Sequence, residues 1–345
     1  MGPAFSRRLA SARTTVFPPV IVGTYRSSDH WTARSATRRT CETGIVPPLT
    51  LSSALTGWTA DLPAIGLVVV LGVAYLAGVR HADTPWPKSR HVAFGVGLGL
   101  LALMGVSFVG RYADTLFWVR ALQVITLLMV VPLCLALGSP VALVLAWRPS
   151  LRGVLSSRMA RVLTFPATAS LLLVATPWLL YFTGWYPLVL RDTVVDHLSR
   201  LALLLVGFLY FYSRLQLDPV PHKYPHLISV VITFVEVIFD AALGLVLWLN
   251  PHIVAQTYYE AVGRTWGPSL RTDQIVGAGI LWLVGDLAGL PFLGALMNRM
   301  SHDDATEAAE IDRQLDEAEA AEDPATPPKL WWETDPILAE RFRRG

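Results

Sequence analysis

Charged and amide side chains recur inside the most apolar stretches of this sequence, where an ionisable group is costly and is therefore a candidate for function. Arg120 and Gln123 are three residues apart, so a helix would place both on one face. Asp196 and Arg200 are four residues apart, and His197 lies beside them. The candidate set comprises Arg120, Gln123, Asp196, His197, Arg200, Glu236, Asp240, Asp273, Gln274 and Asp286. We expect these residues to line one polar cavity within the membrane.

Two kinds of chemistry fit this set. In the first, the two arginines form a buried ion-pair network with Glu236, Asp240 and Asp286, because an unpaired charge in the membrane would be strongly destabilising. In the second, the cavity binds a cation, a metal ion or a polar group of a partner. His197 is the candidate metal ligand, but a single histidine does not make a metal site. Both interpretations stay open at the level of the sequence.

The sequence contains no nucleophile motif, phosphate-binding loop or zinc signature, so we do not expect an enzyme. The glycines of GVGLG at residues 95–99 lie inside an apolar run, where small residues allow helices to pack closely. The net charge of +2 is too small to indicate a nucleic-acid partner.

Seven apolar runs would position these side chains. Hydrophobic residues make up 53% of the 345 residues and charged residues 16%, whereas soluble domains have about 25% charged residues. Each run is close to the roughly 20 residues that cross a bilayer. The runs cover residues 62–80, 91–110, 115–137, 161–184, 195–214, 226–249 and 274–297. The sequence therefore predicts an all-α integral membrane protein, a bundle of seven transmembrane helices in a bacterial plasma membrane.

Basic residues near the ends of the runs predict the orientation of the bundle, because cytoplasmic connections are rich in Lys and Arg. The connections after the first, third and fifth runs carry more of them than the others. We therefore expect the N-terminus outside and the C-terminus in the cytoplasm. With a rise of about 1.5 Å per residue, Arg120, Gln123, His197 and Arg200 then lie near the outer face, and the expected cavity opens outward.

Three parts of the chain are predicted. Residues 1–60 are rich in Arg, Ser, Thr and Pro, and we expect a disordered extension, or sequence upstream of the true start. Residues 61–298 form the membrane domain. Residues 299–345 form a cytoplasmic tail, with an acidic helix over 303–323 and an aromatic and basic end over 329–345.

An ordered set of sequence elements over roughly residues 62–297 resembles the CtaG-type cytochrome c oxidase assembly factors. The elements are AYLAGVRH (74–81), WPKSRHVAF (86–94), YADTLFW (112–118), VVPLCLALGSPVALVL (130–145), LDPVP (217–221) and TDQIVGAGILWLVGD (272–286). The resemblance implies that the chain helps to mature the copper centres of haem–copper oxidases on the outer side of the membrane. It also implies an oxidase subunit or a copper donor protein as partner, besides the lipid bilayer, and makes copper a candidate ligand.

The sequence departs from the family pattern where copper ligands would be expected. The family has a histidine, two further residues and then Gln-His, and here these positions read Arg120, Gln123 and Val124. A histidine pair expected in the fifth run is represented by His197 and Leu201. The Asp-Gln of the seventh run is kept as Asp273 and Gln274. Because a guanidinium repels a metal cation and cannot ligate it, we expect a divergent member that assists assembly without holding copper.

Two other functions remain as alternatives. A small proton-coupled transporter could use Glu236, Asp240 and Asp286 as titrating groups, although we find no inverted repeat of the kind many transporters show. A structural membrane scaffold would need the charges only to hold the bundle together. The leading hypothesis is a non-enzymatic assembly factor for a terminal oxidase.

Overall fold

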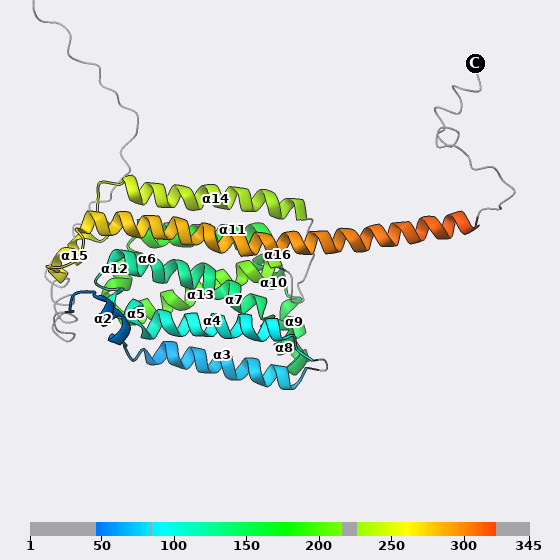
Figure 1. The fold of residues 1–345 in the computed structure, drawn as a ribbon, viewed down its shortest axis with the longest axis horizontal. Coiled ribbons are helices and arrows are strands. Elements are labelled where there is room, and N and C mark those ends of the chain that lie inside the picture. Colours follow the sequence, from blue (N-terminus) through cyan, green and yellow to red (C-terminus); the bar gives the residue numbers. More distant parts are fainter. Residues whose placement is uncertain (1–45, 83–84, 216–225, 322–345) are drawn as a thin grey trace, which may run out of the picture. The chain divides into compact units, whose positions relative to one another are not determined.

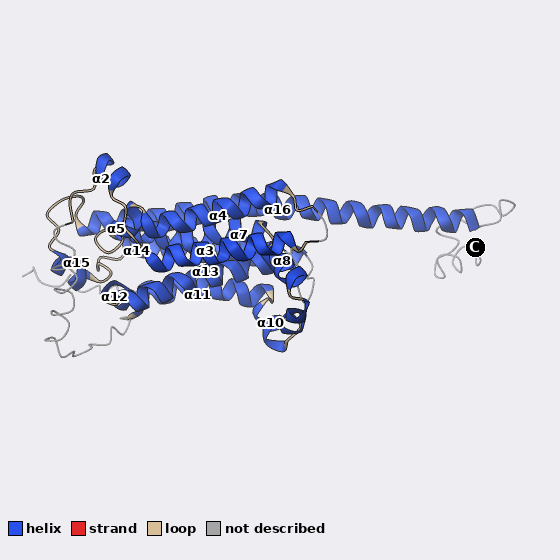
Figure 2. Ribbon diagram, turned by 90° about the horizontal axis from the view of Figure 1, so that it is seen from below, coloured by secondary structure: helices blue, strands red, loops and turns tan. Residues whose placement is uncertain are grey.

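The computed structural model describes residues 46–82, 85–215 and 226–321, which all belong to one structural unit, Ile45–Gly345. Figures 1 and 2 show helices and connecting loops throughout these residues, and the described residues contain no strand. The predictions made for residues 1–45, for the LDPVP element and for the aromatic and basic end lie outside the described residues. The all-helical prediction is confirmed for the rest.

The helices follow the predicted apolar runs, with several short helices at their ends. The long helices are α3 (Leu62–Arg80), α4 (Lys88–Val106), α11 (Pro166–Phe182), α13 (Thr193–Leu215), α14 (His226–Leu249) and α16 (Leu270–Ala321). The third run divides into α6 (Phe117–Ile125), the π-helix η1 (Thr126–Val130) and α7 (Val131–Leu137). The short helices are α2 (Leu51–Thr56), α5 (Phe108–Tyr112), α8 (Pro140–Trp147), η2 (Pro149–Leu151), α9 (Arg152–Leu155), α10 (Arg158–Leu163), α12 (Trp185–Arg191) and α15 (Gln256–Val262).

Among the described residues, four helical segments are long and apolar enough to cross a membrane. They are Leu62–Arg80, Lys88–Tyr112, Phe117–Leu137 and Thr193–Leu215. A fifth is added if α11 and α12, which meet at a bend of 70°, count as one broken span. The two remaining predicted runs coincide with α14 and with the first half of α16, which are helical as expected. That all seven cross the bilayer stays a prediction.

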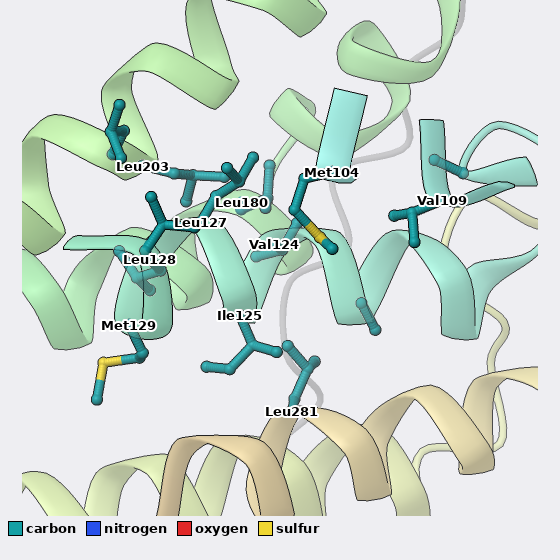
Figure 3. Close-up of a cluster of buried hydrophobic side chains, with 14 of the residues drawn as sticks. Met104, Val109, Val124, Ile125, Leu127, Leu128, Met129, Leu180, Leu203 and Leu281 are labelled. Carbon is teal, nitrogen blue, oxygen red and sulfur yellow. The ribbon is translucent and has the colours of Figure 1, made fainter. Parts of the chain in front are cut away.

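The α6–η1–α7 segment is the centre of the bundle. It packs against α4, α13 and α16, and 83% of the residues in its most apolar 18-residue stretch are buried, whereas the value for α3 is only 11%. In Figure 3, Ile125 of this segment faces Leu281 of α16, and Leu127 lies near Leu180 of α11 and Leu203 of α13. The exposed apolar side chains of α3 are those expected of a helix that faces lipid.

A proline explains how α13 approaches the central segment so closely. Pro132 has no backbone N–H, so it cannot donate to the carbonyl of Leu128 one turn earlier. The irregular turn η1 precedes it. Gly207 of α13 packs onto this carbonyl, and a Cβ at position 207 would collide with Leu128 O and with Cγ of Pro132. A glycine is therefore required where the two helices cross.

Residues 46–60 differ from the predicted disordered extension. Thr50 and Ser53 form a reciprocal cap at the start of α2, and Val46 and Leu49 pack against the core. Two long-range hydrogen bonds add to this, from Tyr112 Oη to Pro47 O (3.1 Å) and from Trp266 Nε1 to Val46 O (3.0 Å). The prediction was wrong here because it treated a short capped turn as uniformly irregular.

The acidic stretch is helical as far as Ala321 and is continuous with the last apolar run. Figure 1 shows α16 continuing past the ends of its neighbours. The predicted boundary at residue 298 is therefore a change in side-chain chemistry within one helix, since the backbone has no break there.

Candidate functional site

Two arginines, the buried Arg120 on α6 and the partly buried Arg200 on α13, share a carboxylate at the end of the bundle where α3 begins. Arg120 Nη1 donates to Asp196 Oδ1 (2.7 Å), and Arg200 Nη2 donates to Asp196 Oδ2 (2.5 Å). Each arginine also has a second aspartate. Arg120 Nη2 contacts Asp114 Oδ1 at 2.5 Å, and Arg200 Nη1 contacts Asp61 Oδ2 at 2.7 Å. We call these five residues the Asp–Arg network.

Burial makes this pairing necessary. Arg120 is 2% exposed and Asp196 is 4% exposed, so removing either partner would leave an uncompensated charge out of contact with water. Three carboxylates and two guanidinium groups give the network a formal charge of −1. Asp114 is the most accessible member, with a side chain that is 39% exposed.

Gln123 connects the network to a third helix. Its Oε1 accepts from Arg120 Nη1 (2.8 Å), and its Nε2 donates to the backbone carbonyl of Met104 on α4 (2.7 Å). Arg120 and Gln123, three residues apart, thus lie on one helix face as predicted, and both polar atoms of the Gln123 amide form hydrogen bonds. Gln123 is 1% exposed, which leaves it no role in contacting a partner directly.

His197 lies at the edge of the network, but its surroundings do not fit a copper site. Its Nδ1 is 2.6 Å from the carbonyl of Thr193, so Nδ1 carries the proton. Its Nε2 is 3.4 Å from Asp61 Oδ1, and that carboxylate is already bound by Arg200. Within the described part of the chain, no three His, Cys, Asp or Glu residues are grouped to hold a metal ion.

A cavity of about 350 Å³ opens beside the Asp–Arg network. Asp61, His197 and Arg200 line its polar side, and apolar residues of α3, α4, η1 and α13, most of them leucines, line the remainder. Such a cavity, apolar with a few polar groups, can accommodate an amphipathic surface of a partner and fix its orientation.

Asp273 and Gln274 hold the start of α6 and the loop before α16. Asp273 accepts hydrogen bonds from the backbone N–H groups of Phe117 (3.2 Å) and Trp118 (2.9 Å) and contacts Arg264 Nη2 (3.2 Å). It therefore acts as a helix cap supplied from a distant part of the chain. Gln274 accepts from Val254 N (2.8 Å), and both residues are 1% exposed or less.

A pair of buried tyrosines lies close to Arg120. Tyr186 of α12 and Tyr259 of α15 share a hydrogen bond of 2.7 Å between their hydroxyl groups. Burial raises the pKa of Tyr259 well above its ordinary value, so this residue stays protonated and can serve as a hydrogen-bond donor.

Glu236 belongs to a second cluster further along the bundle. Its Oε2 accepts from Tyr210 Oη (2.8 Å) and lies 3.7 Å from Arg214 Nη2. Arg214 is fourteen residues beyond Arg200 on α13, which corresponds to about 21 Å along the helix. Asp240 is half-buried and close enough to Glu236 to be repelled by its charge. Asp286 also repels Asp240, and it is exposed.

The predicted single cavity is therefore wrong, and so is the predicted pairing. Arg120 and Arg200 pair with Asp61, Asp114 and Asp196, while Glu236 pairs with Arg214. The predicted ion pairs were wrong because the rotation of each helix and the order of its neighbours decide which polar faces meet. The spacing of residues along one apolar run specifies neither of these. Sequence reasoning missed Asp61 and Asp114. Asp61 directly precedes the first apolar run, and Asp114 directly precedes the third. Their position beside these runs, at the end of the bundle where Arg120 lies, could have identified them.

The sequence profile of the family described as "Cytochrome c oxidase caa3 assembly factor (Caa3_CtaG)" matches residues 73–303. The chain belongs to the caa3 assembly factor family. An uncharacterized protein of Mycobacterium bovis is 30% identical to this family member over 284 residues, which is 78% of this chain and 43% of the relative. An uncharacterized protein of Mycobacterium tuberculosis has the same values. One of Mycobacterium leprae is 29% identical over 283 residues.

The chain spans about two-fifths of the length of the curated relatives it matches. No solved structure matches it. The match to the caa3 assembly factor family includes Arg120, Asp196 and Arg200 but begins after Asp61. The predicted family is confirmed, and the network thus lies largely within the family region.

Proposed function

We propose that this chain assists the assembly of a haem–copper cytochrome c oxidase by contacting an oxidase subunit or a copper donor protein, without catalysing a reaction. The match to the caa3 assembly factor family over residues 73–303 carries this proposal. The cavity beside the Asp–Arg network supports it, because His197 and Arg200 offer a partner polar groups at the rim of an apolar surface. Copper is then cargo delivered to the oxidase, and the residues around His197 do not hold it.

All seven helices cross the bacterial plasma membrane in this proposal, with the N-terminus outside. The distribution of basic residues supports this orientation, because Arg80 and Lys88 lie at the opposite end of α3 and α4 from Asp61. Positive residues favour the cytoplasmic side. The Asp–Arg network then faces outward, the side on which the resemblance places copper-centre maturation.

Deletion of the gene tests the proposal. Reduced-minus-oxidised difference spectra of membranes should show less assembled oxidase in the deletion strain than in the parent, and the wild-type gene should restore the signal. Unchanged oxidase absorbance in the deletion strain would contradict the proposed function.

A scaffold role is the second candidate, favoured by the pairing of both Arg120 and Arg200 with aspartates. If the protein is only a scaffold, Asp196→Asn should lower the amount of assembled oxidase only in proportion to the fall in the amount of the protein itself. An assembly factor that contacts its partner through the exposed part of the Asp–Arg network should behave differently when the accessible Asp114 is replaced by Asn. The amount of assembled oxidase should then fall by more than the amount of this protein does. The transporter alternative, which depends on Glu236, Asp240 and Asp286, stays a prediction.

A further inference from the structure

A second cavity lies between α11 and α14, away from the Asp–Arg network. Its volume is about 490 Å³. On α11 it is lined by small and apolar residues from Ala167 to Trp178, and on α14 it is lined by Ile232, Val235, Glu236 and Phe239. We call it the α11–α14 groove. Leu171 beside it is 67% exposed, and Val235 is 46% exposed, so the groove faces the surroundings of the bundle.

Three polar atoms in this groove lack a hydrogen-bond partner among the described residues. They are Ser170 Oγ, Trp178 Nε1 and Glu236 Oε1. Ser170 and Glu236 are both 5% exposed. Ser170 lies near the Glu236 carboxylate, but the two do not reach hydrogen-bonding geometry. A buried polar group without a hydrogen-bond partner is destabilising, so these atoms indicate a missing ligand.

Their chemistry specifies what the ligand must offer. The carboxylate oxygen of Glu236 requires a donor, the indole N–H of Trp178 requires an acceptor, and the hydroxyl of Ser170 accepts either. An amide side chain provides both, and a hydroxyl side chain provides both on one atom. The rest of the ligand must be apolar, because the other lining residues are apolar.

The depth of Glu236 excludes phospholipid head groups as the source of these polar atoms. Glu236 is ten residues from the start of α14 and thirteen from its end, so it lies about 15–20 Å from either end of the helix. A head group stays at the membrane surface. A polar group at mid-depth must therefore be carried by an apolar segment that itself spans the membrane.

The shape of the groove favours a helix as that segment. The groove extends from Ala167 to Trp178, which is about 16 Å of helix axis or three turns. Ala167, Ser170 and Ala175 put small side chains along it, and small residues let a second helix backbone approach closely. Polar side chains of one membrane helix commonly bond to those of another.

We propose that the α11–α14 groove binds a transmembrane helix of an oxidase subunit that carries an Asn, Gln, Ser or Thr side chain at mid-membrane depth. The proposal rests on the proposed assembly function and names the surface that performs it. The partner's side chain bonds to Glu236 Oε1, Trp178 Nε1 and Ser170 Oγ, while its apolar face covers Val174 and Ala175.

Site-specific photo-crosslinking in the full-length chain, expressed in its own cells, tests this. The photoreactive residue p-benzoylphenylalanine is placed at Leu171 in the groove or at Val70 on α3, which are exposed to similar degrees, 67% and 63%. We expect the Leu171 adduct to contain a transmembrane peptide of an oxidase subunit with an amide or hydroxyl residue. Equal capture from Val70, adducts with a second copy of this chain only, or adducts with lipid or quinone only would overturn the proposal.

Filling the groove gives a second, independent measurement. Ala175→Trp should reduce the Leu171 crosslink per molecule about tenfold, because the new indole occupies the groove and keeps the partner's polar side chain from its hydrogen bond to Glu236. Val73→Trp on the exposed face of α3 is the matched control. Ser170→Ala, which barely changes volume, should weaken the crosslink in the same direction. If gene deletion lowers the oxidase but Ala175→Trp alters neither crosslink nor oxidase, the assembly function stands and the groove assignment fails.

Discussion

Arg120 of α6 donates a 2.7 Å hydrogen bond to Asp196 of α13, and this contact connects two helices whose residues are 76 positions apart in the sequence. Both side chains are almost completely buried. Burying either charge alone would be strongly destabilising, and the opposite charge of its partner offsets that cost. The pair thus sets the relative rotation of the central helix and α13.

Asp196→Asn should destabilise the protein strongly. The substitution removes the carboxylate that two guanidinium groups share, and breaking a buried pair costs about 3–5 kcal/mol. We expect a clearly lower unfolding temperature in detergent, measured by loss of monodisperse protein on heating. Asp312→Asn on the exposed part of α16 is the matched control and should have no effect. An Asp196→Asn protein as stable as the control would contradict the network.

Gly207→Ala should also destabilise the protein, for a steric reason. The new Cβ would collide with the carbonyl of Leu128 and with Pro132, and overpacking typically costs about 1–3 kcal/mol. Gly66→Ala on α3 is the control, because no atom lies within 4 Å of a Cβ there. That control should be neutral or stabilising by up to about 1 kcal/mol, since alanine favours a helix. Equal thermal stability of both variants would show that α13 and η1 do not cross this closely.

Asp273→Asn should loosen the start of α6. The amide cannot accept with both of its terminal atoms, so one of the contacts to Phe117 N, Trp118 N or Arg264 is lost. We expect a loss of about 1–3 kcal/mol. Faster hydrogen exchange at the amides of Phe117 and Trp118 would report it locally, while amides in α3 should be unchanged. Unaltered exchange at both positions would count against the capping role.

Copper loading distinguishes a copper-holding protein from one that acts by contact. The purified chain should retain far less than stoichiometric copper after loading and desalting, because Asp61, which lies beside Nε2 of His197, is already bound by Arg200, and a guanidinium repels a metal cation. His197→Ala should retain the same small amount. Stoichiometric copper that disappears in His197→Ala would restore a ligand role for this residue.

The positions of the helices could be predicted from the sequence, but the contacts between helices could not. Runs of about 20 apolar residues predict α3, α4, α13 and α14 directly, because the bilayer leaves few other structures for such runs. The side-by-side placement of Arg120 and Gln123 also follows from helix spacing. Which carboxylates meet Arg120 depends on neighbour order and rotation, and these arise from packing such as that of Gly207 on Leu128.

Asp61 and Asp273 illustrate the same limit at the ends of helices. Asp61 caps α3, with its Oδ1 accepting from Ala64 N (3.0 Å), and this role is readable from an Asp just before an apolar run. Its second role, binding Arg200 from 139 positions away, is not readable from the sequence. Likewise, the backbone donors that Asp273 satisfies are 155 and 156 positions away.

A role in oxidase assembly is tested most directly by the copper-to-haem ratio of the cytochrome c oxidase purified from a strain lacking this gene. We predict less assembled oxidase, and a copper content per haem below that of the oxidase from the parent strain, with both values restored by the wild-type gene. Oxidase in normal amount with its full complement of copper would contradict a role in oxidase assembly.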